Sequence, residues 1–201
     1  MQVRKTIWIP IVGGLIFGAL SFLISAANIT IQVSRDLILG PWEIFNTISA
    51  ALFGPIGLLI TQLGMDTGGY LYLLKGVSPE PQNVYFITCD YVAHSVSMLA
   101  IAFGYKFVYT RMKMPLLLAG WILILGVYYV MLAILQVFLY NTFVPEVEAT
   151  YMFYFNNIPV ELTLIIVITS LILFGLPARY RKPQWYEMKQ TTEQSSKIQD
   201  K

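Results

Sequence analysis

Apolar residues in this chain come in long runs that are separated by short polar segments. The clearest runs cover residues 7–28, 85–108, 115–139 and 159–176. A transmembrane helix needs about 20 mostly apolar residues, because each residue advances the helix by about 1.5 Å. The pattern therefore predicts that each of these four runs crosses a membrane.

A further apolar stretch, from Pro41 to Leu74, is interrupted by Gly54 and Pro55. Proline has no backbone N–H to donate, and glycine adopts backbone conformations that other residues avoid. This pair is typical of a tight turn between two helices, although a kink within one long helix is an alternative. We interpret the stretch as a helix hairpin. The fold class is then an all-α membrane protein, a bundle of six transmembrane helices.

Composition supports a membrane protein and helps to divide the chain. Hydrophobic residues make up 57% of the 201 residues and charged residues only 12%, which is unusual for a soluble domain. The first run resembles a signal peptide, but it is longer than the usual core of about 7–15 apolar residues, so we expect a retained helix. We expect a membrane domain over residues 1–182. The polar tail, 183–201, is expected to be disordered and cytoplasmic, because it has too few apolar residues to bury.

Basic residues are unequally divided between the two sides of this six-helix arrangement. Eleven lie on the side that holds both termini, and only Arg35 and Lys75 lie on the other side. Lysine and arginine are enriched in cytoplasmic loops. The distribution therefore predicts that both termini are cytoplasmic.

Several ionisable residues fall within the predicted helices, towards their outer ends. Asp90 and His94 are four residues apart and so share a helix face, and Asp66 lies near the end of its helix. Charges inside membrane spans are costly and usually face a cavity or a partner. Simpler roles stay open: Glu43 and Glu161 stand at predicted helix starts, where a carboxylate is favourable, and Asp90 could simply pair with His94.

We expect these groups to converge on an outward-facing pocket for a small, ring-containing molecule that is neutral or cationic. Such sites are mostly apolar, with a few polar groups that orient the ligand. The candidate substrate-binding residues are Trp42, Glu43, Asp66, Tyr85, Asp90, His94, Tyr140, Asn157 and Glu161.

Other chemistries find little support in the sequence. One Asp-His pair makes a poor metal site, and the single Cys89 provides no paired-cysteine site. The chain has no GxxxxGK[ST] phosphate-binding loop and no HExxH motif. We therefore expect no enzyme activity, no catalytic residues, no metal, no cofactor and no nucleic-acid partner.

Small residues recur at helical spacing in two of the predicted helices. In lipid, helices associate by close packing, so small residues mark the faces that meet another helix. Either stripe packs within the chain or docks a different membrane protein, and spacing alone does not distinguish these alternatives. The first stripe consists of Gly14, Gly18, Ser21 and Ser25, and the second of Gly57, Thr61, Gly64 and Gly68.

The segment "FGPIGLLITQLGMD" resembles a turn found in the S components of energy-coupling factor vitamin transporters, and "FGYKFVYTR" is similar to another pattern of that family. Six helices in about 200 residues and an extended first outer segment agree with the resemblance, which covers most of residues 7–182. The resemblance implies a multi-pass protein of a prokaryotic plasma membrane. It also implies that the protein binds a vitamin or vitamin precursor and works with a membrane T component and two cytoplasmic ATPase subunits.

The resemblance also implies roles for particular residues. The family's T-component contact on the first helix corresponds to Gly14, Gly18, Ser21 and Ser25, although alanines are often found there in the family. Relatives that transport cobalt or nickel have a histidine directly after the initiator methionine, and Gln2 stands there in this chain. Two alternatives stay open: a non-transporting scaffold that resembles the rod-shape membrane protein MreD, and a free-standing small-solute carrier.

Overall fold

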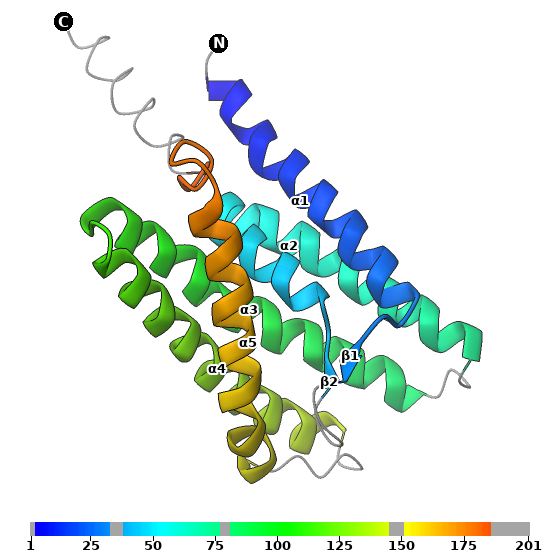
Figure 1. Cartoon of the computed structure of the whole chain (residues 1–201). Coiled ribbons are helices and arrows are strands. Elements are labelled where there is room, and N and C mark those ends of the chain that lie inside the picture. Colours follow the sequence, from blue (N-terminus) through cyan, green and yellow to red (C-terminus); the bar gives the residue numbers. More distant parts are fainter. Residues whose placement is uncertain (1–2, 33–37, 77–80, 145–150, 186–201) are drawn as a thin grey trace, which may run out of the picture.

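The computed structural model of the chain describes residues 3–32, 38–76, 81–144 and 151–185 and shows five helices there (Figure 1). After the first helix, strands β1 (Ile31–Gln32) and β2 (Ile38–Leu39) pair antiparallel, so the predicted extended segment is partly a strand. The helices are α1 (Val3–Ala26), α2 (Trp42–Gly76), α3 (Pro81–Arg111), α4 (Leu116–Phe143) and α5 (Tyr151–Gly175).

The chain is a helical membrane protein. In the part that the structure describes, α1, α2, α3 and α4 are long and apolar enough to cross a membrane, and α5 contributes a shorter apolar part. Large apolar side chains are widely exposed on the outside of the bundle, including Leu123 (69%) and Leu171 (71%). These surfaces would be costly in water but are compatible with lipid.

Helix α2 is folded back on itself at Gly54. The φ angle of Gly54 is 67° and its ψ angle is −158°, which separates residues 42–53 from residues 55–76. Asn46 donates a hydrogen bond to Gln62 over 2.9 Å, and the hydroxyl groups of Ser49 and Thr61 lie 2.7 Å apart. Residues of the two arms are therefore side by side, and the prediction of a helix hairpin at this position is confirmed.

One predicted helix boundary is wrong. Helix α5 begins at Tyr151 rather than at residue 159, and Pro159 lies inside it. A helix in a membrane tolerates an internal proline because neighbouring groups compensate for the lost hydrogen bond. Glu161 therefore lies well within α5, and stabilisation of a helix N-terminus does not explain its position.

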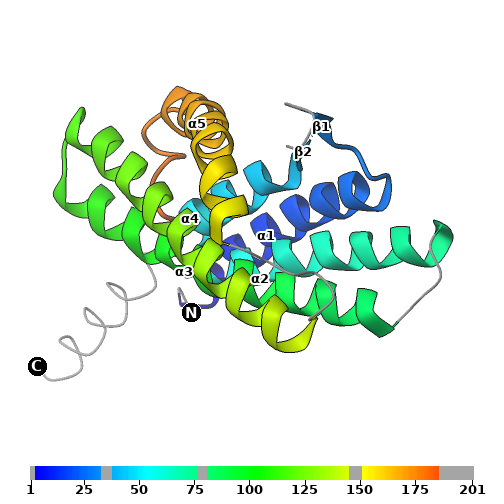
Figure 2. The same cartoon turned by 90° about the horizontal axis from the view of Figure 1, so that it is seen from below.

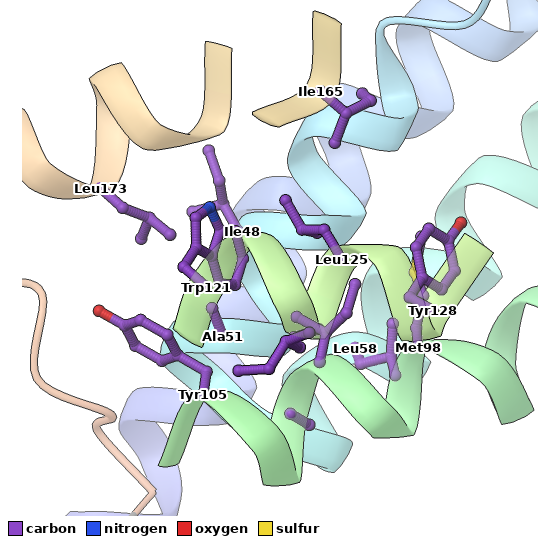
Figure 3. Close-up of a cluster of buried hydrophobic side chains, with 14 of the residues drawn as sticks. Ile48, Ala51, Leu58, Met98, Tyr105, Trp121, Leu125, Tyr128, Ile165 and Leu173 are labelled. Carbon is purple, nitrogen blue, oxygen red and sulfur yellow. The ribbon is translucent and has the colours of Figure 1, made fainter. Parts of the chain in front are cut away.

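The helices are arranged around α2. Helix α1 packs on α2, α3 packs against both α2 and α4, and α5 contacts α4 and α2 (Figure 2). Side chains from α2, α3, α4 and α5 form an apolar core (Figure 3). Tyr105 and Tyr128 lie at opposite ends of this cluster, with Trp121 and Leu125 between them.

The first small-residue stripe lies in the contact between α1 and α2. A Cβ atom added to Gly14 would be 2.9 Å from the Cα of Gly57, and one added to Gly18 would be 3.0 Å from the carbonyl oxygen of Ile60. Ser21 is fully buried and Ser25 is 8% exposed. The stripe packs within the chain in this structure. Docking of a T component at these four residues stays a prediction, and it would require α1 to separate from α2.

The segment after α5 returns to the hairpin. The backbone N–H of Gln184 donates to the carbonyl oxygen of Leu52 over 2.7 Å, and the hydroxyl of Tyr105 donates to the carbonyl oxygen of Arg181 over 2.8 Å. The indole of Trp185 lies against Gly54. Contacts with the helices thus continue to Trp185, and the rest of the predicted disordered tail, 186–201, is outside the described residues.

Candidate functional site

A buried histidine connects three helices at the start of the hairpin. His94 on α3 places its Nδ1 atom 3.3 Å from Oε1 of Glu43, the second residue of α2. The hydroxyl of Tyr128 on α4 donates to Oε2 of Glu43 over 3.0 Å and lies 3.2 Å from the same histidine nitrogen. All three residues are buried.

The other side of the histidine ring faces a second carboxylate. The Nε2 atom of His94 is 3.4 Å from Oδ1 of Asp90, one helical turn earlier on α3. The same carboxylate oxygen accepts hydrogen bonds from the side chains of Gln136 and Tyr140 on α4, both at 2.8 Å. The prediction that Asp90 and His94 share a helix face is confirmed, and the structure shows the pairing that the sequence had left open as a simpler alternative. We refer to Glu43, Asp90, His94, Tyr128, Gln136 and Tyr140 as the polar network.

The network places a carboxylate against each nitrogen of His94. A doubly protonated imidazole has an N–H on both nitrogens and can donate to Glu43 and Asp90 at once. At separations of 3.3 and 3.4 Å, longer than those of tight charge-assisted bonds, the three groups form an ion-pair chain when His94 is doubly protonated. Buried charges need such partners, because their desolvation is costly.

A small cavity lies beside Asp90. It has a volume of about 110 Å³. Asp66, from the second arm of α2, lies in its wall, and the Oδ2 atom of Asp66 is buried without a hydrogen-bond partner among the described residues. An unpaired buried acceptor is unfavourable and calls for a donor or a cation. The cavity is lined by Ser25, Trp42, Met65, Asp66, Gly69, Phe86, Ile87 and Asp90.

Carboxylates outnumber basic groups around this cavity. Glu43 and Asp90 share His94, whereas Asp66 has one oxygen without a partner. Glu161 on α5 is close enough to Glu43 and His94 to interact with both electrostatically. The site therefore holds more carboxyl groups than basic groups, an arrangement that suits a cation or a strong hydrogen-bond donor.

The structure brings most of the predicted binding residues together. Glu43, Asp90, His94 and Tyr140 belong to the polar network, and Trp42 and Asp66 line the cavity. Tyr85 is 57% exposed and does not line this cavity. The side chain of Asn157 falls outside the part of the chain that the structure describes.

Two members of the network were not predicted. Tyr128 and Gln136 lie on the same buried face of α4 as Tyr140. The amide of Gln136 within a highly apolar helix was the available signal, since such a polar side chain is expensive in lipid unless it meets a partner. Its spacing of four residues before Tyr140 places both on one face.

Comparisons with known proteins identify no relative. No family model matches this chain, and no curated protein or solved structure is significantly similar to it. Within the described ranges, no group of three or more His, Cys, Asp or Glu side chains is arranged to hold a metal ion. The fold and the site thus define a helical membrane protein with a buried acidic network.

Proposed function

We propose that this chain is the substrate-binding subunit of an uptake system for a vitamin or a vitamin precursor. Its substrate would be a small ring compound that is neutral or cationic and enters from outside the cell. The observation that supports this most is the unpartnered Asp66 oxygen in the wall of a cavity that also contains Trp42 and Asp90.

The chemistry of the cavity supports a positively charged or donor-rich ligand. A ligand N–H group near Asp66 would satisfy the buried oxygen, and aromatic rings at Trp42 and Phe86 offer cation–π or stacking contacts. Pockets for whole small molecules usually measure about 300–1,000 Å³, whereas this cavity has about 110 Å³. It thus has room for the polar end of such a ligand, and binding of the ring would require the surrounding helices to move apart.

The proposed energy source lies in other subunits. The sequence has no phosphate-binding loop, and its resemblance to S components suggests a T component and two cytoplasmic ATPase subunits. The hairpin at Gly54 supports the resemblance, because it lies within the "FGPIGLLITQLGMD" segment. Co-purification with these subunits is expected. Transport by the chain alone would favour a free-standing carrier, and binding of no nutrient would favour an MreD-like scaffold.

We also propose six membrane segments, with both termini in the cytoplasm of a prokaryotic cell. The two arms of α2 would each enter the membrane from the same outer side and meet at Gly54. The basic residue Lys106 of α3 lies close to this turn, because its amine is 4.4 Å from the ring centre of Trp185, which packs against Gly54. A reporter fused after Lys201 should therefore read as cytoplasmic, and an external reading would contradict the arrangement.

A ligand screen tests the function directly. Thermal-shift measurements on the detergent-purified chain would compare a cationic vitamin (thiamine), a neutral one (riboflavin) and an anionic one (biotin). We expect the cationic or the neutral compound to stabilise the protein and the anionic compound to have no effect. Stabilisation by biotin alone would contradict the proposed charge preference.

Substitutions then test the site. Asp66→Asn and Asp90→Asn should weaken binding at least tenfold, because truncating one partner of a buried charge pair costs about 2–5 kcal/mol. Glu161→Gln should weaken binding in the same direction. Thr67→Ala is the matched control, since Thr67 is exposed and its hydroxyl donates to the carbonyl oxygen of Leu63 in its own helix. Unchanged affinity in both aspartate variants would place the ligand elsewhere.

A further inference from the structure

A second hollow lies on the outside of the bundle between α3 and α4, and none of its lining residues belongs to the small cavity beside Asp90. Its volume is about 310 Å³, and only apolar side chains and glycines line it. Leu123 is 69% exposed and Phe107 is 49% exposed, so the hollow opens outwards. Its walls include Ala100, Gly104 and Phe107 on α3 and Gly120, Leu123 and Val127 on α4. We call it the α3–α4 groove.

Two glycines explain why the groove exists. A Cβ atom at Gly120 would lie 2.5 Å from Cγ1 of Val108, and one at Gly104 would lie 2.9 Å from Cγ1 of Ile124. The missing side chains let the two helices approach closely at the base of the groove. Larger residues on either side then form its walls.

The groove is about as long as one membrane leaflet is thick. One wall runs from Ala100 on α3 to Met112, the residue directly after α3, which is about 18 Å at a helical rise of about 1.5 Å per residue. The hydrocarbon core of a bilayer is about 30 Å thick, so one leaflet is about 15 Å deep. The groove therefore extends from near the membrane surface to about the middle of the bilayer.

Positive charge is concentrated at the surface end of the groove. The guanidinium carbon of Arg111 lies 4.1 Å from the centre of the Phe107 ring, which lines the groove. Lys113 follows two residues later, and both basic residues are exposed. The sequence contains no acidic residue between Asp90 and Glu146, so no carboxylate of α3 or α4 beyond Asp90 offsets this charge.

We propose that the α3–α4 groove binds one anionic phospholipid from the leaflet that meets Arg111. One acyl chain lies in the groove, and the headgroup phosphate contacts Arg111 and Lys113. Arginine and lysine are effective phosphate partners, and basic groups at the end of a membrane helix attract anionic lipids. This inference does not depend on the nutrient-binding function, because it uses different residues.

Native mass spectrometry of the delipidated, detergent-purified full chain tests the proposal. The probes are phosphatidylglycerol and phosphatidylcholine with identical acyl chains. We expect one tightly bound phosphatidylglycerol and weaker phosphatidylcholine binding. Arg111→Ala and Lys113→Ala should each weaken phosphatidylglycerol binding about fivefold, with little effect on phosphatidylcholine. Arg179→Ala is the matched control, because the guanidinium carbon of Arg179 also lies over an aromatic ring, that of Tyr180 at 4.5 Å, but outside the groove.

Filling the groove separates acyl-chain binding from headgroup attraction. Ala100→Phe should weaken the binding of both lipids, and Leu123→Trp at the exposed rim provides a second variant if Ala100→Phe does not fold. Equal affinity for the two lipids, or an equal loss in Arg179→Ala, would overturn the proposal. Binding of inorganic phosphate in place of the lipid, or a second copy of the chain bound at the groove in place of lipid, would also overturn it.

Discussion

Two contacts within this bundle join helices in opposite ways. Between α1 and α2, glycines bring backbone against backbone, as Gly14 and Gly57 show. Between α2, α3 and α4, charged and polar side chains reach across the gap, with His94 between Glu43 and Asp90. The first contact depends on shape, and the second depends on charge balance.

The difference determines which substitutions each contact tolerates. In the α1–α2 contact the atom that meets an added methyl group is backbone, which cannot rotate away. In the polar network the side chains can rearrange, but removal of one group leaves its partners buried without compensation. A change of volume should therefore damage the first contact, and a change of charge should damage the second.

The largest effect is expected from His94→Ala. This substitution removes the imidazole that lies between the carboxyl groups of Glu43 and Asp90, so both stay buried without their shared partner. Breaking a buried ion pair costs about 3–5 kcal/mol. We expect a marked drop in the melting temperature of the detergent-purified protein. Adding Glu43→Gln and Asp90→Asn to His94→Ala removes the stranded charges and should restore much of the stability. A variant His94→Ala as stable as the wild type would show that the network is not held by charge.

A smaller loss is expected from Gly64→Ala in the α1–α2 contact. A Cβ atom at Gly64 would clash with the backbone carbonyl of Gly18, and overpacking of this kind costs about 1–3 kcal/mol. The melting temperature measures the loss. Gly126→Ala is the matched control, because nothing lies within 4 Å of an added Cβ there.

The control should change stability in the opposite direction. Alanine is favoured over glycine within a helix by about 1 kcal/mol, so Gly126→Ala should stabilise α4 slightly. Equal effects of the two substitutions would contradict the view that α1 and α2 are joined by backbone contact. Gly14→Leu and Gly18→Leu should likewise destabilise the isolated protein, whether or not a T component docks on α1.

The smallest effect is expected from Gln136→Leu at the edge of the polar network. The substitution removes one hydrogen bond to Asp90, whereas the bond from Tyr140 to the same oxygen stays. Side-chain hydrogen bonds between membrane helices contribute about 0.6 kcal/mol on average. A shift of the melting temperature much larger than that of Gly64→Ala would mean that other side chains of the polar network depend on Gln136 for their positions.

Features that depend on neighbouring residues in the sequence could be predicted. The turn at Gly54 follows from the Gly-Pro pair, and the shared helix face of Asp90 and His94 follows from their spacing. The start of α5 was misplaced because Pro159 is a plausible first residue of a helix, yet it lies inside one.

Features that depend on how the helices pack could not be predicted. Glu43 meets His94 only because the first arm of α2 crosses α3, and Tyr128 joins them from α4. Both small-residue stripes were visible in the sequence, but their spacing does not show that they face each other. Periodicity gives the face of a helix, and the partner of that face is set by three-dimensional packing.

The contact between Trp185 and Gly54 has a consequence for the order in which the protein is made. The indole of Trp185 occupies the space that a side chain at position 54 would need, and it lies 4.4 Å from the amine of Lys106. During synthesis the hairpin turn leaves the ribosome long before Trp185 is added. The turn is therefore uncovered while α3, α4 and α5 are being inserted, and it is covered only after residue 185 has been translated.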